Sequence, residues 1–232
     1  MQGPSRKLPP GLPVRLDRPA VVVGAAPFDA GLVEQLTGRG FALVAADGAA
    51  DDLALAGLTP ELIVGDFDSI DDAAVFAGRA RMVRLDEQDT TDFEKCIYAT
   101  EAPLYVGLGL TGRRFDHTLA AIHVVTRFAG QRKILLVDEH DVALAVSGPF
   151  ALSIEPGERV SVYPLGQVRF ARSRGLKYPL DGLEMAPGIR TGTSNVATVG
   201  AFSIEPAAGE TAPWLLIVER LHLTALIDAL LG

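Results

Sequence analysis

The sequence predicts a mixed α/β protein, with an N-terminal parallel-sheet, Rossmann-like α/β domain followed by a smaller C-terminal antiparallel β-sandwich. Two observations carry this prediction. Short apolar runs alternate with helical patterns from residue 20 to about residue 139, which is typical of a parallel sheet with right-handed crossovers. From residue 140 onward, short strand-like runs are separated by turn-forming Gly and Pro residues, as in an antiparallel sandwich.

In the first domain, the strand ending at Gly24 is rich in Val, as expected of a strand buried on both faces. Each following apolar run ends in a similar way, at a Gly or at an acidic residue. The expected strands are 20–24, 41–46, 62–64, 82–85, 104–108 and 134–137, and the expected helices are 28–37, 53–56, 71–77, 91–100 and 116–128.

The remaining segments complete the domain prediction. Residues 1–19 are rich in Pro, Arg and Gly and are expected to form a flexible N-terminal arm. The α/β domain is expected over residues 20–139 and the β-sandwich over residues 140–232. The expected strands of the sandwich are 142–146, 151–154, 159–163, 168–171, 196–204 and 214–219, followed by a terminal helix over 221–231.

Composition limits the functional classes. The net charge of −8 argues against nucleic acid as a partner, because a phosphate backbone requires basic residues to neutralise it. No stretch reaches 18 apolar residues and no secretory signal is recognisable, so we expect a cytoplasmic protein without a membrane span. The single cysteine, Cys96, lies in an apolar helical pattern and is expected to be a buried, inert thiol.

The segment Gly65-Asp66-Phe67-Asp68-Ser69 follows a buried strand. On an extended backbone, Asp66 and Asp68 would point to the same side, roughly 6–7 Å apart. Two carboxylates at the end of a parallel strand suit Mg²⁺, which binds one or two carboxylates and leaves its other positions to water and phosphate. The alternative is that Asp68 or Ser69 only caps the helix expected after it.

Other acidic residues follow neighbouring strands, and the carboxyl ends of parallel strands lie at one edge of a sheet. Their convergence would be unfavourable without a cation, because like charges repel at short range. The residues concerned are Asp47, Asp66, Asp68, Asp89 and Asp92, with Asp116 following a later strand.

Three further residues are candidates for phosphate binding. Gly24 leaves backbone N–H groups free for an anion, and Arg114 is a suitable countercharge for a triphosphate. Thr91 is expected to cap a helix in a Thr-x-x-Glu capping box, and the N-terminus of that helix would favour phosphate. The alternative for Arg114 is a surface salt bridge, the role expected of Arg113. No P-loop, Gly-x-Ser-x-Gly motif or dinucleotide fingerprint is present.

Five motifs, in order, resemble the thiamine pyrophosphokinase family. They are Gly65-Asp66-Phe67-Asp68-Ser69, Gln88-Asp89-Thr90-Thr91-Asp92-Phe93-Glu94-Lys95, Gly112 with Arg114-Phe115-Asp116-His117, Gly175-Leu176-Lys177-Tyr178-Pro179-Leu180, and Ser194-Asn195. The resemblance implies Mg²⁺-dependent transfer of pyrophosphate from ATP to the thiamine hydroxyl, giving thiamine diphosphate and AMP. It also implies a homodimer with shared active sites.

The resemblance also implies roles for individual residues. It places Asp47, Asp66, Asp68 and Asp92 at the metal and Gln88, Thr91, Arg114 and Asp116 around ATP and the reacting hydroxyl, with Asp68, Asp92, Arg114 and Asp116 as the catalytic set. Tyr178 would lie against the thiamine rings, where an aromatic face favours the thiazolium cation. Ser194, with Asn195 beside it, would contact the pyrimidine.

Two residues depart from the family pattern, since Arg113 replaces a frequent glycine and Ala121 a frequent asparagine. Three other functions stay open: a pyrophosphokinase acting on a hydroxymethyl-pterin, a metal-dependent sugar-nucleotide transferase, and a non-catalytic nucleotide or thiamine sensor. The transferase alternative leaves the motifs around Asp92 and Arg114 unexplained. The sensor alternative does not require the acidic residues.

Overall fold

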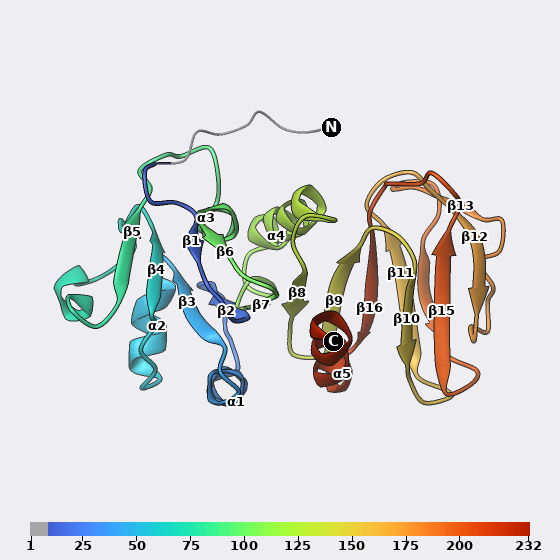
Figure 1. Cartoon of the computed structure of the whole chain (residues 1–232), viewed down its shortest axis with the longest axis horizontal. Helices are drawn as coiled ribbons and strands as arrows, with labels where there is room; N and C mark the ends of the chain where they lie inside the picture. Colours follow the sequence, from blue (N-terminus) through green and yellow to red (C-terminus); the bar gives the residue numbers. More distant parts are fainter. Residues whose placement is uncertain (1–8) are drawn as a thin grey trace. The chain divides into compact units, whose positions relative to one another are not determined.

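The computed structural model describes residues 9–232, and the chain divides into two compact units, Met1–Arg114 and Phe115–Gly232 (Figure 1). The mixed α/β class expected from the sequence is confirmed. The division between the units falls earlier than the boundary expected near residue 139, because α4 (Phe115–Phe128) and β8 (Ile134–Val137) group with the later strands. The functional domains 20–139 and 140–232 stay a prediction.

The first unit is built on a parallel sheet with the strand order β7-β2-β3-β4-β5. Its strands are β2 (Ala20–Val23), β3 (Ala42–Ala46), β4 (Leu62–Gly65), β5 (Arg81–Arg84) and β7 (Tyr105–Leu108). Every residue of β2, β3, β4 and β7 is buried, which explains their almost purely apolar sequences. The strands carry loops at their carboxyl ends, and these loops hold the expected site residues.

The helices of this unit are α1 (Ala30–Gly38), α2 (Ala49–Leu55) and α3 (Asp92–Ala99). The Asp29 carboxylate caps α1 by accepting from the N–H of Leu32 at 3.1 Å. The helix expected over residues 71–77 is instead a short 3₁₀ turn, η1 (Ala73–Phe76). Asp72 caps this turn, and Gly78, with a φ of 74°, follows soon after it, so only one turn forms.

Part of the expected N-terminal arm is ordered by strand pairing. Residues 1–8 lie outside the described residues. Within the described part, β1 (Val14–Arg15) pairs in parallel with β6 (Thr100–Glu101), and the N–H of Leu16 donates to the carbonyl of Glu101 at 2.8 Å. Two-residue strands of this kind have no apolar periodicity, which is why the sequence did not indicate them.

The second unit contains α4 and two sheets with the strand orders β14-β11-β16-β9-β8 and β10-β15-β12-β13, in which every pair of neighbours is antiparallel. Its later strands are β9 (Asp141–Val146), β10 (Phe150–Ser153), β11 (Arg159–Pro164), β12 (Val168–Arg174), β13 (Glu184–Met185), β14 (Gly192–Val196), β15 (Ala201–Pro206) and β16 (Trp214–Glu219). A 3₁₀ turn, η2 (Arg220–His222), leads into the terminal helix α5 (Leu223–Leu231).

The single strand expected over residues 196–204 is wrong. That region contains the end of β14 and most of β15, and these strands lie in different sheets. Apolar residues, Val196, Ala197, Val199, Ala201 and Phe202, continue across the turn between these strands, so the hydrophobic pattern shows no break there. The core itself includes the buried pair Trp214 and Phe170, whose rings meet edge to face with centroids 5.7 Å apart.

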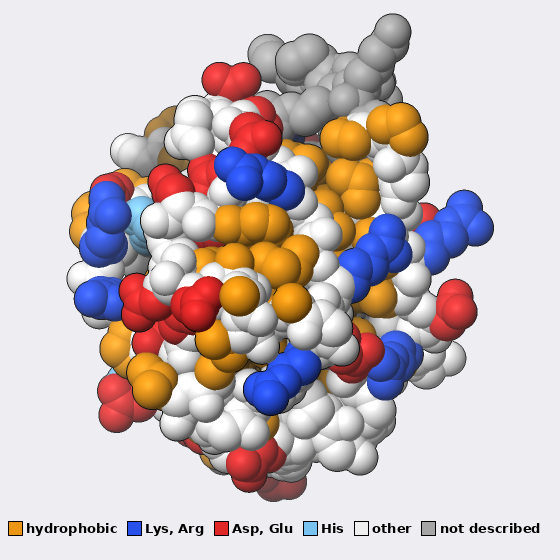
Figure 2. Space-filling view, turned by 90° about the vertical axis from the view of Figure 1, so that its left-hand side faces the viewer, with side chains coloured by type: hydrophobic (Ala, Val, Ile, Leu, Met, Phe, Trp, Pro, Cys, Tyr) orange, Lys and Arg blue, Asp and Glu red, His pale blue; other side chains and the backbone are white. Residues whose placement is uncertain are grey.

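One face of the protein carries side chains of both charges. In the space-filling view of Figure 2, acidic and basic side chains are interspersed with apolar ones. No helix within residues 9–232 has both the length and the apolar character needed to cross a membrane.

Candidate active site

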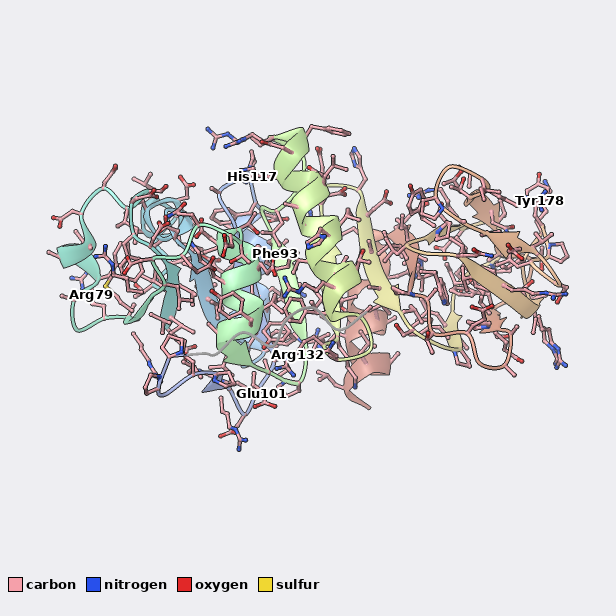
Figure 3. The ribbon with its side chains drawn as sticks, turned by 90° about the horizontal axis from the view of Figure 1, so that it is seen from above. Arg79, Phe93, Glu101, His117, Arg132 and Tyr178 are labelled. Carbon is pink, nitrogen blue, oxygen red and sulfur yellow. The ribbon has the colours of Figure 1, made fainter. Side chains whose placement is uncertain are left out.

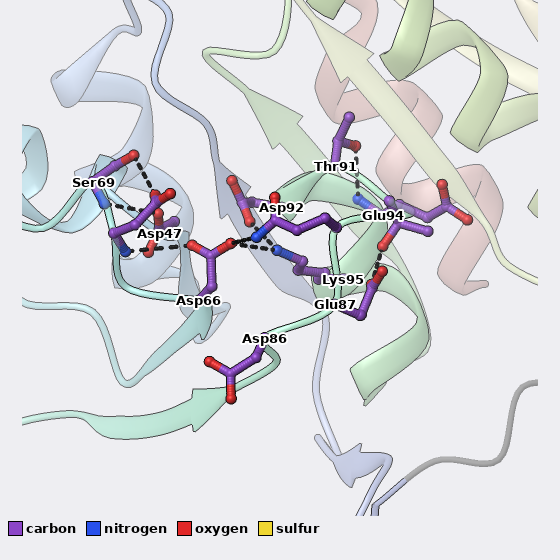
Figure 4. Close-up of polar contacts among 12 residues, drawn as sticks. Asp47, Asp66, Ser69, Asp86, Glu87, Thr91, Asp92, Glu94 and Lys95 are labelled. Atoms are coloured by element: carbon purple, nitrogen blue, oxygen red, sulfur yellow. Dashed lines mark hydrogen bonds and ion pairs between the residues drawn. The ribbon is translucent and has the colours of Figure 1, made fainter.

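The candidate site lies at the carboxyl ends of β3 and β4. The register of the parallel pair places Ala46 beside Val64, so Asp47 and the loop after Gly65 leave the sheet together. The first turn of α3 adds Asp92, and the helix packs against the same two strands. The expected convergence of acidic residues at this edge of the sheet therefore has a structural basis (Figure 4).

Asp47 organises the loop that follows β4. Its carboxylate is 1% exposed and accepts hydrogen bonds from the N–H groups of Phe67 at 2.9 Å and Ser69 at 3.3 Å. Its backbone has a φ of 48°, a strained value for a residue other than glycine. A Cβ on Gly65 would lie 2.6 Å from the Cβ of Asp47, so only glycine fits beside it.

An extended backbone was expected between Asp66 and Asp68, and this expectation is wrong. Phe67 has a φ of 69°, and the N–H of Asp68 donates to Asp66 Oδ1 at 3.3 Å, so the segment forms a tight turn. The turn nevertheless brings the carboxylates together, since Asp47, Asp66 and Asp68 each offer an oxygen within 4.8 Å of the other two. Neither Asp68 nor Ser69 caps a helix here, because η1 begins only at Ala73, with Asp72 as its cap.

Lys95 is the residue of this site that the sequence analysis missed. Its side chain is 3% exposed, and its ammonium donates to Asp92 Oδ1 at 3.0 Å and Asp66 Oδ2 at 3.3 Å (Figure 4). The spacing of Asp92 and Lys95, three residues apart on a helix, was a signal that could have indicated the pair. Asp92 is thus tied to a cation of the protein itself, and it is not among the three acids whose oxygens cluster within 4.8 Å.

The pKa shifts at the site follow from these contacts. Burial, with the nearby charge of Asp92, raises the pKa of Asp47 from 3.8 to about 6. Burial acts in the same direction on Asp66, but hydrogen bonds from Gln88 and Asp68 and the charge of Lys95 outweigh it and lower its pKa. Burial would lower the pKa of Lys95, yet the two carboxylates reverse that effect and raise it.

The segment between β5 and α3 contributes polar contacts. Gln88 Nε2 donates to Asp66 Oδ2 at 2.6 Å, so it lies beside the acidic residues rather than apart from them. Thr91 caps α3, as expected, by accepting from the N–H of Glu94 at 3.4 Å. The N–H of Asp89, a residue also expected at this edge, donates to Glu87 Oε2 at 2.8 Å, and Asp89 is not one of the clustered acids.

The loops after β2 and β7 pack closely. A Cβ on Gly24 would lie 2.7 Å from the carbonyl oxygen of Gly109, so both loops need glycine to approach each other. Arg113 donates to the carbonyl of Ala25 at 3.0 Å, which links the same two loops. This arginine was expected in a surface salt bridge, but its hydrogen bond instead ties the loop after β7 to the loop after β2. Arg114 is exposed at the end of the first unit.

Asp116 and Tyr178, two expected site residues of the second unit, are both exposed. Asp116 lies in the first turn of α4, and its carboxylate accepts from the N–H of His117 at 2.9 Å. Tyr178 is 58% exposed in the loop after β12 (Figure 3), and the ammonium of Lys177 lies 5.5 Å from its ring centroid. Ala121, expected to be a packing residue of this helix, is buried.

Asn195 is buried beneath the loop that carries Tyr178. Its Oδ1 accepts from the N–H of Tyr178 at 3.0 Å, and its Nδ2 donates to the carbonyl of Tyr178 at 2.7 Å. This amide positions the loop, and the substrate contact expected for Asn195 stays a prediction. Ser194 is exposed with a φ of 59°, and its N–H donates to Ser161 Oγ at 3.0 Å.

Comparison with known proteins gives relatives of one kind. The family model "Thiamin pyrophosphokinase, catalytic domain" matches residues 33–137. The chain is 30% identical over 154 residues to thiamin pyrophosphokinase 1 of Caenorhabditis elegans, covering 60% of this chain and 63% of that protein. It is 32% identical over 155 residues to thiamine pyrophosphokinase 1 of rice, covering 59% of each. The chain thus matches about three fifths of the length of these curated relatives.

Solved structures show the same fold at lower identity. Thiamin pyrophosphokinase from Candida albicans has a TM-score of 0.73 at 16% identity, covering 94% of this chain and 97% of that one. The enzyme from Geobacillus thermodenitrificans has a TM-score of 0.72 at 21% identity, covering 87% and 97%. At these identities the likeness concerns the fold alone.

Fold and site together define a mixed α/β protein with clustered acidic residues at the carboxyl edge of a parallel sheet. As the motifs indicated, residues 33–137 are similar to the catalytic domain of thiamin pyrophosphokinases, and the relatives found by sequence carry that name.

Proposed function

We propose that this protein transfers the pyrophosphoryl group of ATP to the hydroxyl of thiamine, giving thiamine diphosphate and AMP. The observation that carries the proposal is the cluster of Asp47, Asp66 and Asp68, which lies within the residues that match the thiamin pyrophosphokinase catalytic domain. A cluster of carboxylates at the end of parallel strands is where an open α/β sheet binds phosphate compounds through a metal.

The residues present fit Mg²⁺. All three offer carboxylate oxygens, the ligands that this hard cation prefers, and these oxygens lie within 4.8 Å of one another. Asp68 and Asp66 are the more accessible members, whereas Asp47 is buried behind them. When bound, Mg²⁺ would neutralise charge on the phosphate oxygens. The motif resemblance also places Asp92 in the proposed metal set, and Asp92 and Asp66 share a contact with Lys95.

The chain's own groups would bind ATP around this cluster. We assign the triphosphate to the exposed guanidinium of Arg114 and the N-terminal end of α3 behind Thr91. The N–H groups of Gly24 and Ala26, expected to be free for an anion, instead donate to the carbonyls of Leu108 and Gly109. The amide of Gln88 already donates to the Asp66 carboxylate. When ATP binds, this amide would either donate to the nucleotide instead or keep holding Asp66 in position. These contacts position the β-phosphorus for attack, and positioning with electrostatic stabilisation accounts for most of phosphoryl-type catalysis.

In the reaction, a bond forms between the thiamine hydroxyl oxygen and the β-phosphorus, and the bond from that phosphorus to the bridging oxygen of AMP breaks. The hydroxyl proton leaves to a carboxylate or to water, and AMP keeps the bridging oxygen. Asp68, Asp92 and Asp116 are the candidates for the acid residue that orients the hydroxyl.

We assign thiamine to the second unit. The exposed ring of Tyr178 offers a face to the thiazolium cation, and Ser194 would contact the pyrimidine. Asn195 would hold the Tyr178 loop in shape from below. In this proposal residues 20–139 bind ATP and metal, a β-sandwich over residues 140–232 binds thiamine, and two subunits share their sites as a homodimer. A cytoplasmic location also stays part of the proposal.

The experiment is an assay of AMP release from ATP and Mg²⁺ with three acceptors: thiamine, a hydroxymethyl-pterin and a sugar phosphate. The proposal expects AMP with thiamine alone. AMP with the pterin would indicate the alternative pyrophosphokinase, and release of inorganic pyrophosphate from a nucleoside triphosphate with the sugar phosphate would indicate the transferase. Binding of thiamine without any product would indicate a sensor.

A further inference from the structure

A buried cation lies inside the acidic cluster. The ammonium of Lys95 is within hydrogen-bonding distance of both Asp66 and Asp92, whose side chains are 12% and 38% exposed against 3% for the lysine (Figure 4). Because its side chain is enclosed, Lys95 cannot serve as a direct phosphate ligand without rearrangement. It acts on the site through the two carboxylates.

The position of Lys95 is fixed by its helix. Its neighbours in α3, Phe93, Cys96 and Ile97, are buried, so α3 is anchored in the core. The thiol of Cys96 adds no negative charge beside Lys95, since burial raises its pKa well above the usual value. The carboxylates of Asp66 and Asp92 therefore share one fixed positive charge, and that charge offsets part of their mutual repulsion in the absence of a metal.

We infer that Lys95 is a built-in competitor of the divalent cation, which holds Asp66 and Asp92 in place and keeps the metal affinity of the substrate-free protein low. The inference rests on the metal site of the proposed function, not on thiamine as the acceptor. Asp66 Oδ2 already accepts from Lys95 and Gln88. The charge of Asp66 is therefore partly neutralised before any metal binds, which weakens its attraction for a divalent cation. A nucleotide would add phosphate oxygens as further metal ligands and so strengthen metal binding.

The test measures Mn²⁺ binding to the substrate-free protein by electron paramagnetic resonance and calorimetry. Lys95→Met removes the charge at similar length, and Lys95→Gln removes it while keeping a donor, which serves if the methionine variant does not fold. Both neutral variants should bind Mn²⁺ at least about tenfold more tightly than the wild type, since a positive charge near the metal has been removed. Lys95→Arg, which keeps the charge, should stay within about threefold of the wild type.

A double substitution separates charge from packing. Asp92→Asn should weaken Mn²⁺ binding, and the Asp92→Asn/Lys95→Met double variant, which restores the net charge of the cluster, should return to within about threefold of the wild type. Arg18→Met is the matched control, because it removes an exposed cation that pairs with Glu61 in the same unit. It should leave Mn²⁺ affinity unchanged.

The kinetics give a second readout. The neutral variants should lose turnover by about tenfold or more even at saturating metal, because Asp66 and Asp92 are no longer held, and Lys95→Arg should recover part of it. Unchanged or weaker Mn²⁺ binding in both neutral variants would overturn the inference. The binding assay contains no thiamine, so failure of the proposed activity would show separately, as an absence of AMP release in the wild type.

Discussion

The pKa of Asp47 predicts a specific dependence of stability on pH in the metal-free protein. The folded protein holds this carboxyl at a pKa of about 6 against 3.8 for the free side chain, a difference of about 2.2 units. At 1.36 kcal/mol per unit, ionising Asp47 in the folded state costs up to about 3 kcal/mol. The perturbation is Asp47→Asn, which removes the charge and keeps an oxygen able to accept from the N–H of Phe67.

The direction follows from proton linkage. Between pH 3.8 and about 6 the folded protein binds more protons at Asp47 than the unfolded chain, so the free energy of unfolding falls as pH rises through this window. Asp66 has a lowered pKa, so its contribution is lost only as pH falls below 3.8 and does not overlap with this window. Above about pH 6.5 the Asp47 effect is complete.

The assay is urea unfolding in EDTA at intervals from pH 4.5 to 7.5 for the wild type and Asp47→Asn. The free energy of unfolding of the wild type should fall by about 2 kcal/mol relative to the variant across this range, since the rest of the effect lies below pH 4.5. Taking the difference between the two proteins cancels the contributions of other titrating groups. Mg²⁺ should restore much of the lost stability to the wild type alone. A difference that stays constant with pH would refute the reasoning.

Three other predictions follow from the site. Asp66→Asn should lower turnover at least about 100-fold while the circular dichroism spectrum stays unchanged, and normal activity with Mg²⁺ would contradict the metal assignment. Arg114→Ala should raise the KM for ATP and lower kcat together, and a change confined to thiamine would place Arg114 on the other substrate. An Asp68→Asn chain mixed with a Tyr178→Ala chain should recover about a quarter of wild-type sites, because half of the dimers are mixed and one site in each is intact. No recovery despite proven exchange would mean that each site is built within one chain.

Much of the first unit could be predicted from the sequence because its strands are buried on both faces. Apolar runs such as those ending at Ala46 and Val64 indicate buried parallel strands. The acidic residues that follow them then lie at one edge of the sheet. The cap at Thr91 was also predictable, since a Thr-x-x-Glu pattern has a local mechanism.

Contacts between distant residues could not be read in the same way. The turn at Phe67 depends on N–H groups that the buried carboxylate of Asp47 accepts from, twenty residues earlier in the chain. The burial of Lys95 beside Asp66 likewise depends on how α3 packs on the sheet, although its spacing from Asp92 was visible. The role of Asn195 is set by the loop of Tyr178, and the sequence showed only that both residues belong to family motifs.

The transfer of an intact pyrophosphoryl group is tested most directly by following a label from ATP to product. ATP labelled at the γ-phosphate is incubated with thiamine, Mg²⁺ and the wild-type protein, with Asp66→Asn as the inactive control. We expect the label to appear in thiamine diphosphate and AMP to form in equal amount, because the β- and γ-phosphates move together. Formation of ADP, or labelled inorganic phosphate without AMP, would contradict it.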